Sequence, residues 1–223
     1  KTGLNQVNAI FTNQGRAWFV SNRNQLWTTD GTAAGTILLK TFVLQTFDDS
    51  ASGFTALGSS VVFSANDTGS GWEPWISDGT VAGTRTLGDL VPGATGSGAS
   101  AFTPLGGALY FVTYPTMGSA LWKTNGTPAG TVLVRDFGTD AVTALGVAGS
   151  RLVGIVVTTN RVWASDGTDQ GTAFFNAGPS TLQLYRLHTV GNAVLFRGLE
   201  TNASGVSDDV AELWRSDGTL AGS

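Results

Sequence analysis

Apolar and polar residues alternate along this chain in short runs that are separated by glycine-rich turns. In the second period of the sequence, four such runs fall at residues 53–58, 61–66, 73–77 and 84–90. The third period has matching runs at residues 101–106, 108–114, 120–124 and 131–137. Alternation over four to eight residues is typical of β-strands, and no sustained helical periodicity interrupts it. The pattern therefore predicts an all-β fold.

A short sequence recurs five times and defines the period. The stretch LWTTDGTAAGT at Leu26–Thr36 returns as PWISDGTVAGT, LWKTNGTPAGT, VWASDGTDQGT and LWRSDGTLAGS. Repeats of about 40–50 residues are typical of propeller blades. Each copy carries one tryptophan; these are Trp27, Trp75, Trp122, Trp163 and Trp214.

Five periods of four antiparallel strands predict a five-bladed β-propeller formed by residues 1–223 as a single domain. A closed ring would remove the exposed sheet edges of a linear array. The segment 130–146 aligns without a gap with the last two residues followed by the first fifteen. We therefore expect the N-terminal strand, residues 1–5, to close the last blade, which is built mainly from residues 184–223.

A second alignment of the N-terminus leaves another architecture open. Lys1 and Thr2 can also be placed on Lys40 and Thr41, with three residues missing from the repeat. The chain would then be a piece of a longer array of sheets.

The Asp-Gly or Asn-Gly pair of each copy predicts a tight turn. Glycine adopts positive φ at little cost, and an Asp or Asn side chain accepts hydrogen bonds from backbone amides two residues on. Metal binding or acid catalysis by these positions is the alternative, but Asn125 cannot be a general acid and still makes a turn. The turn pairs are Asp30-Gly31, Asp78-Gly79, Asn125-Gly126, Asp166-Gly167 and Asp217-Gly218.

The motif tryptophans precede these turns on strands of alternating polarity. We expect them to pack between adjacent blades, where a large ring fills the gap between twisted sheets. The alternative is that they are aromatic platforms for a sugar, as in lectin propellers.

The charge and composition of the chain argue against several classes of partner and ligand. The formal net charge is −4 and the sequence pI is about 4.8, and Lys and Arg occur singly, so nucleic acid is not an expected partner. The chain contains no cysteine, which excludes disulfides and Cys-type zinc sites. No apolar run approaches the roughly 18 residues of a membrane span. The oligomeric state stays open.

The connections on one face of the predicted blades are uniform, whereas those on the other face vary widely in length and composition. Loops that vary on a rigid scaffold often carry binding. Aromatic and amide-rich loops suit sugars, which stack on rings and pair with polar groups. The candidate ligand-binding residues are Asp49, Asn66, Asp67, Trp72, Tyr114, Asp140 and Asp208.

Catalysis and metal binding have weaker support in the sequence. A glycosidase needs two converging carboxylates, and the acids near strand ends show no recognisable catalytic spacing. Residues 66–71 and 207–212 are rich in oxygen ligands but match no known calcium loop, so no cofactor is expected and calcium is a minor alternative. We expect the single histidine, His188, to be buried and hydrogen-bonded. The acids in question are Asp48, Asp49, Asp89, Asp136 and Asp140.

These repeats resemble the ELWxxDGT repeats of large, mostly bacterial, exported or surface-associated proteins. Residues 87–131 follow the fuller family pattern closely, and AELWRSDGTLAGS matches its signature. Pro74, Ala120, Arg161 and Gln25 are interpreted as replacements of the motif's Glu, and the linkers after the first, third and fourth units lack its Pro-Gly. The resemblance implies an extracellular or cell-surface setting and implies little about activity.

The leading functional hypothesis is a non-catalytic extracellular recognition module that binds carbohydrate, in the manner of a lectin, through its variable loops. The first alternative is a structural or protein-protein interaction module of a larger surface protein. The second alternative is a glycoside hydrolase. The expected partners are thus a glycan or a surface protein.

Overall fold

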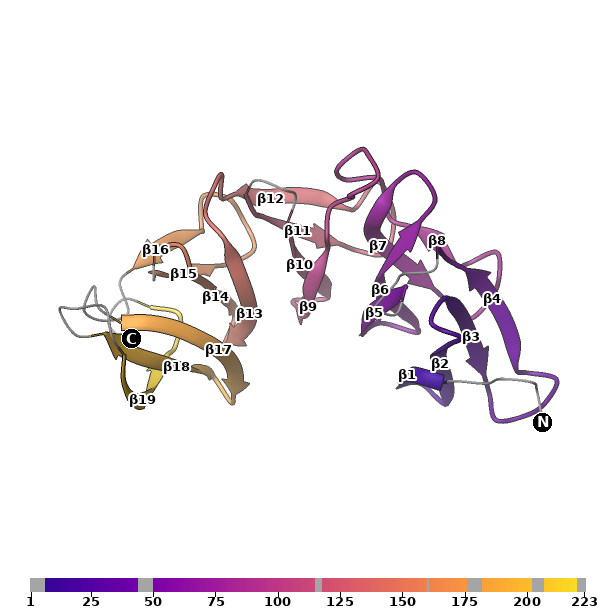
Figure 1. Ribbon diagram of the computed structural model, residues 1–223, viewed down its shortest axis with the longest axis horizontal. Coiled ribbons are helices and arrows are strands. Elements are labelled where there is room, and N and C mark those ends of the chain that lie inside the picture. The colour runs from indigo at the N-terminus through magenta and orange to yellow at the C-terminus, as the bar shows by residue number, and fades with distance from the viewer. Residues whose placement is uncertain are drawn as a thin grey trace. The chain divides into compact units, whose positions relative to one another are not determined.

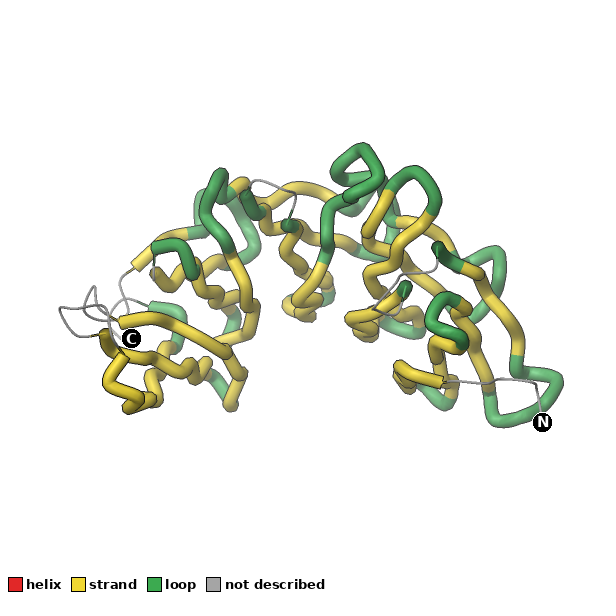
Figure 2. The backbone as a smooth tube through the Cα atoms, viewed as in Figure 1, coloured by secondary structure: helices red, strands yellow, loops and turns green. Residues whose placement is uncertain are grey.

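A computed structural model describes residues 7–43, 50–114, 118–159, 161–175, 182–201 and 207–219. Within these ranges the chain consists of strands and loops and has no helix (Figure 2). The all-β prediction is therefore confirmed. The prediction that residues 1–5 close the last blade concerns residues outside this described part.

The strands form five antiparallel sheets in which sequence neighbours pair (Figure 1). The first sheet contains β1 (Val7–Asn13), β2 (Arg16–Ser21), β3 (Gln25–Thr29) and β4 (Ile37–Thr41). The second contains β5 (Ala51–Leu57), β6 (Ser60–Asp67), β7 (Gly71–Ser77) and β8 (Arg85–Thr86). The third contains β9 (Ser100–Leu105), β10 (Ala108–Thr113), β11 (Ala120–Thr124) and β12 (Val132–Asp136).

The last two sheets follow the same order. The fourth contains β13 (Val142–Ala148), β14 (Arg151–Val156), β15 (Arg161–Ser165) and β16 (Ala173–Phe175). The fifth has three strands in the described residues, β17 (Leu182–Val190), β18 (Ala193–Thr201) and β19 (Ser207–Ser216). The chain groups into two compact units, residues 1–102 with 124–131, and residues 103–123 with 132–223.

The first strand of several sheets contains a bulge that the sequence pattern did not indicate. The pairing of β17 with β18 shifts between Tyr185 and Leu187, and Arg186 has a positive φ of 47°. A bulge inserts one residue and so reverses the inward and outward alternation that follows it. His188 is consequently exposed, and the prediction that it is buried is wrong.

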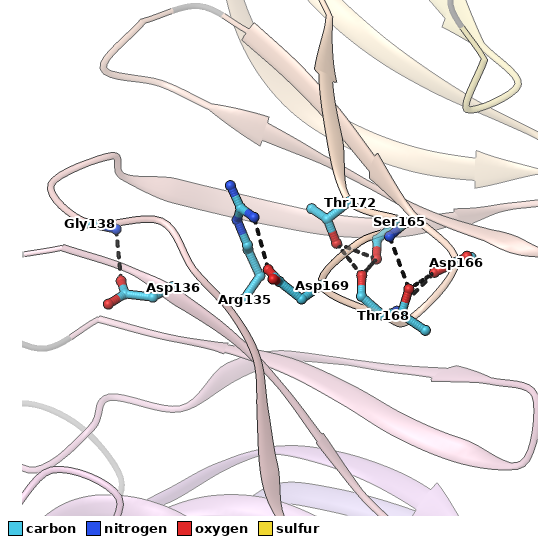
Figure 3. A network of polar contacts seen from close by, with 9 residues as sticks. Arg135, Asp136, Gly138, Ser165, Asp166, Thr168, Asp169 and Thr172 are labelled. Atoms are coloured by element: carbon cyan, nitrogen blue, oxygen red, sulfur yellow. Dashed lines mark hydrogen bonds and ion pairs between the residues drawn. The ribbon is translucent and has the colours of Figure 1, made fainter.

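The repeated turn is a closed network of side-chain and backbone hydrogen bonds, shown for the fourth copy in Figure 3. The Asp166 carboxylate accepts bonds from the Thr168 amide at 2.9 Å and from its hydroxyl at 2.7 Å. The Thr168 hydroxyl accepts the Gly171 amide at 3.0 Å, and the Thr172 hydroxyl donates to the Thr168 carbonyl at 2.7 Å. The third copy makes the same bonds with Asn125 as the acceptor, at 3.1 and 2.7 Å. The predicted turn chemistry is confirmed.

The two glycines of this loop are required for different reasons. Gly167 has a φ of +91°, which the sequence predicted, and a Cβ at this position would also overlap the Tyr110 hydroxyl of the preceding sheet. Gly171 does not have a positive φ, but a Cβ there would overlap the Asp166 carboxylate. The loop is therefore both a turn and a contact between neighbouring sheets.

Two motif tryptophans pack against the preceding sheet, as predicted. Trp75 meets Phe42 edge to face at 5.1 Å between ring centres, and Trp163 meets Phe137 at 5.0 Å. Phe42 and Phe137 occupy the same repeat position, just after the outer strands β4 and β12. The Trp75 and Trp163 indole nitrogens are buried without a hydrogen-bond partner, so the volume of the ring and not its N–H determines the choice of tryptophan.

We expect Gly167→Ala to destabilise the protein more than Gly31→Ala. Both glycines have a φ of +91°, but a Cβ at Gly31 would meet no atom within 4 Å, whereas one at Gly167 would overlap Tyr110. Positive φ costs roughly 1–2 kcal/mol for alanine, and forced overpacking adds about 1–3 kcal/mol. Urea unfolding measures the free energy of unfolding of both variants. An equal loss of stability in Gly167→Ala and Gly31→Ala would show that close contact of this loop with the preceding sheet does not contribute.

Candidate functional site

Three of the predicted ligand-binding residues come together at the end of the β6–β7 hairpin. Asn66 pairs with Trp72, and Asp67 pairs with Gly71. The Asp67 carboxylate lies 3.0 Å from the Lys40 ammonium, which also lies 4.8 Å from the centre of the Trp75 ring. Because its charge is already compensated, Asp67 is a poorer hydrogen-bond acceptor for a ligand than the sequence suggested.

Trp72 was expected in a variable loop but lies in strand β7. Its backbone holds the linker to the third sheet: the Trp72 carbonyl accepts the Gly98 amide at 3.0 Å and the Ser97 hydroxyl at 3.2 Å. The side chain is half-buried. The loop between the two strands is consequently reduced to residues 68–70.

Glu73, and not Pro74, occupies the position of the motif's Glu, so the interpretation of Pro74 as its replacement is wrong. Sequence reasoning therefore missed the role of Glu73. This residue is fully buried, and its carboxylate accepts bonds from the Ser97 hydroxyl at 2.7 Å and the Ser97 and Val91 amides at 3.0 and 3.3 Å. Burial raises the pKa of Glu73, an effect that these hydrogen bonds only partly oppose. Glu73 therefore fixes the Pro-Gly linker that follows the second sheet.

The remaining predicted residues do not form one site. The Asp140 carboxylate is ion-paired with Arg161 at 2.9 Å, and the Arg161 guanidinium lies 4.5 Å from the centre of the Phe174 ring. Tyr114 is half-buried just after β10, and Asp208 lies within β19. Asp49 and Asp48 lie outside the described residues.

Two cavities lie in the second unit, and none of the predicted ligand-binding residues lines them. One, of about 360 Å³, lies beside β16 and the repeated loop of the fifth sheet. The other, of about 350 Å³, lies along β12 and includes Asp169 from the repeated loop of the fourth sheet. Both cavities therefore adjoin the uniform loops and not the variable ones.

The carboxylates of the described residues are used mainly to hold the fold. Asp136 accepts the Gly138 amide at 2.8 Å (Figure 3), and hydrogen bonds from the side chain and backbone of Thr168 lower the pKa of Asp166. Among the described residues no group of three or more His, Asp or Glu side chains is placed to hold a metal ion. The same residues include no helix long and apolar enough to cross a membrane.

Comparison with solved structures shows a propeller-like fold. The chain is similar to the putative TolB from Agrobacterium tumefaciens, with a TM-score of 0.53 and 10% identity over 95% of this chain and 81% of that one. It is similar to YCF48 bound to D1 peptide, with a TM-score of 0.56, 13% identity and coverage of 93% and 66%. It also resembles the computationally designed Ika8 protein, with a TM-score of 0.56 and 16% identity; the match covers 94% of this chain and spans 58% of Ika8. No protein-family model and no curated protein sequence matches the chain.

We expect Glu73→Gln to remove a pH-dependent loss of stability. The folded-state pKa of Glu73 lies above its ordinary value near 4.5, so the wild-type free energy of unfolding falls as the pH rises above that value, until the folded carboxyl also ionises. Glutamine never ionises, so the stability of the variant relative to wild type should increase across this window.

Glu212→Gln is the matched control, because Glu212 precedes Leu213 and Trp214 as Glu73 precedes Pro74 and Trp75, but is exposed. Urea unfolding at several pH values between 4 and 8 measures the difference. If the difference in unfolding free energy between Glu73→Gln and wild type did not change with pH, the folded-state pKa of Glu73 would not be raised. The same pH dependence in Glu73→Gln and Glu212→Gln would lead to the same conclusion.

Proposed function

We propose that this chain is a non-catalytic recognition module that binds a protein partner along the exposed edges of its sheets. The five sheets would be the blades of a propeller in an extracellular or cell-surface protein of the ELWxxDGT type. The extracellular or cell-surface location is proposed from the resemblance of the repeats. Binding of a partner along a sheet edge is proposed from the exposed aliphatic side chains of two edge strands.

The outer strands β4 and β12 display pairs of exposed aliphatic side chains at the same repeat positions. The exposed fractions are 37% for Ile37 and 38% for Leu38, and 39% for Val132 and 50% for Leu133. Both strands lie at the edge of their sheets. An edge strand offers unpaired backbone groups to which an extended peptide can add as a further strand, and alternate side chains give specificity.

A protein partner fits the described residues better than a glycan. Sugar binding needs uncommitted polar groups beside an exposed ring, whereas Asp67 and Asp140 are both ion-paired within the chain. Among the propeller-like neighbours, YCF48 is bound to a peptide. The Asp136 carboxylate accepts a hydrogen bond from the Gly138 amide, and the Asp140 carboxylate is ion-paired with Arg161. Because both carboxylates already have partners within the chain, they are poorly suited to act as the two catalytic acids of a glycosidase.

Selection of displayed random peptides on the full chain tests this proposal. We expect enriched peptides with alternating apolar residues, and binding at least about 10-fold weaker in Leu133→Asp, because a charge replaces a buried apolar contact in the complex. Val81→Asp is the control: Val81 is 60% exposed but lies in a repeated loop and not on a strand edge.

A glycan array probed with the same chain distinguishes the alternatives. Saturable glycan binding together with no enriched peptide would overturn the proposal in favour of a lectin. If Leu133→Asp and Val81→Asp weakened peptide binding equally, the strand edge would not be the binding surface.

A further inference from the structure

Arg151, at the start of β14, forms no direct ion pair within the described residues; its positive charge acts on the Asp166 carboxylate from a longer distance and helps to lower the pKa of that group. Its Nη2 donates to the Gly171 carbonyl at 3.2 Å, while its Nε is buried without a hydrogen-bond partner. No carboxylate within the described ranges lies at ion-pair distance from it. A half-buried guanidinium with an unused donor favours an anionic hydrogen-bond acceptor.

The same side chain lines the larger of the two cavities. This space of about 360 Å³ is bounded by Phe174 and Phe175 of β16, by the small side chains of Ala164 and Ala173, and by the repeated loop at Gly218 and Thr219. Phe175 and the two alanines lie on one face of the fourth sheet, whereas the Phe174 ring packs on the other face against Phe137, so one aromatic ring and two methyl groups form the apolar wall. The cavity thus combines one cation with a largely hydrocarbon wall, as ligand pockets commonly do.

The smaller cavity holds a second arginine that does form an ion pair, although its Nε, like that of Arg151, is buried without a hydrogen-bond partner. Arg135 lines that cavity, and its Nη1 lies 2.8 Å from the Asp169 carboxylate (Figure 3). Asp169 directly follows the DGT of the fourth copy, and Leu220 takes this position in the fifth. The sequence therefore provides an acid at one junction and an apolar residue at the next.

We propose that the cavity at Arg151 binds a carboxylate attached to an aromatic or branched apolar group. The guanidinium receives the carboxylate, and Phe175 with Ala164 and Ala173 receives the apolar group. A free carboxylic acid and the C-terminal residue of a peptide share this chemistry. The proposal does not rest on peptide addition to the edges of β4 and β12.

Calorimetric titration of the full chain with phenylacetate tests the site. We expect saturable binding at one site, weaker by about 10- to 100-fold in Arg151→Gln, because a charge-assisted hydrogen bond is lost. Phenylacetamide should bind as weakly to wild type as phenylacetate binds to this variant.

Arg16→Gln is the matched control. Arg16 begins β2 as Arg151 begins β14, and its side chain lies beside Gly79 as that of Arg151 lies beside Gly218. We expect phenylacetate binding in this variant to equal that of wild type. Equal losses in Arg16→Gln and Arg151→Gln, or no saturable binding to wild type, would overturn the proposal.

A blocking variant keeps the test valid if Arg151→Gln fails to fold. Ala173 is exposed on β16 and lines the cavity, so Ala173→Trp should fill the space without replacing the guanidinium and should abolish phenylacetate binding. Unchanged affinity in a folded Ala173→Trp variant would also overturn the proposal.

Two peptides that end in phenylalanine, one with a free carboxylate and one amidated, identify the natural source of the carboxylate. Tighter binding of the free-acid peptide than of phenylacetate indicates a peptide C-terminus, and weaker binding indicates a small acid. Equal affinity of the free-acid and amidated peptides would contradict recognition of a carboxylate by Arg151.

Discussion

The contact that the second to fifth repeated loops each make with the sheet before them is the constraint on which the fold depends. A single four-stranded sheet cannot bury its apolar face alone, so its stability comes from its neighbours. At two junctions a phenylalanine that follows an outer strand packs on the next motif tryptophan, as Phe42 does on Trp75. The first glycine of the loop then allows close approach, as Gly167 does against Tyr110. Local turn chemistry and contact between sheets are thus imposed by the same few residues.

The fourth sheet shows how strictly the volume around the motif tryptophan is kept. Phe63 stands opposite Trp75 in the second sheet, whereas Gly154 stands opposite Trp163 in the fourth. A Cβ at Gly154 would meet the Trp163 indole at about 2.5 Å, and this tryptophan is fully buried. The indole therefore occupies space that a phenylalanine fills elsewhere, so a large change in sequence preserves the packing.

Two departures from the repeat pattern have one physical cause. The motif's Glu is replaced in the first, third and fourth units, and the linkers after these same units lack Pro-Gly. In the second unit the Glu73 carboxylate binds Val91 and Ser97 of the Pro-Gly linker, so the acid and the linker are needed together. In the fourth unit Arg161 stands in place of Glu and pairs with Asp140 of the preceding linker. The coincidence of the two losses was the signal that could have identified this role.

Sequence reasoning succeeded where the determining interactions are local. The turn network, the positive φ of its first glycine and the strand order all depend on residues within one period. It could not name the partners that come from another sheet, such as Lys40 for Asp67 or Phe42 for Trp75, because neighbouring sheets are not visible in a linear pattern. It also failed at His188, where a bulge of one residue in β17 reverses the inward and outward alternation and leaves the side chain exposed.

The uniform loops, which the sequence assigned to scaffolding, adjoin both cavities, and this follows from how repeats pack. A repeated contact leaves a repeated space, but the lining of that space comes from positions that the motif does not determine. At one junction Arg135 forms an ion pair with Asp169, and at the next Arg151 lines a cavity with Phe175 and two alanines and forms no direct ion pair within the described residues. The repeated loop therefore produces a cavity beside it, while the residues that line this cavity can differ from one junction to the next. Variation in a repeat protein accordingly has to be sought beside the constant motif as well as in the loops of unequal length.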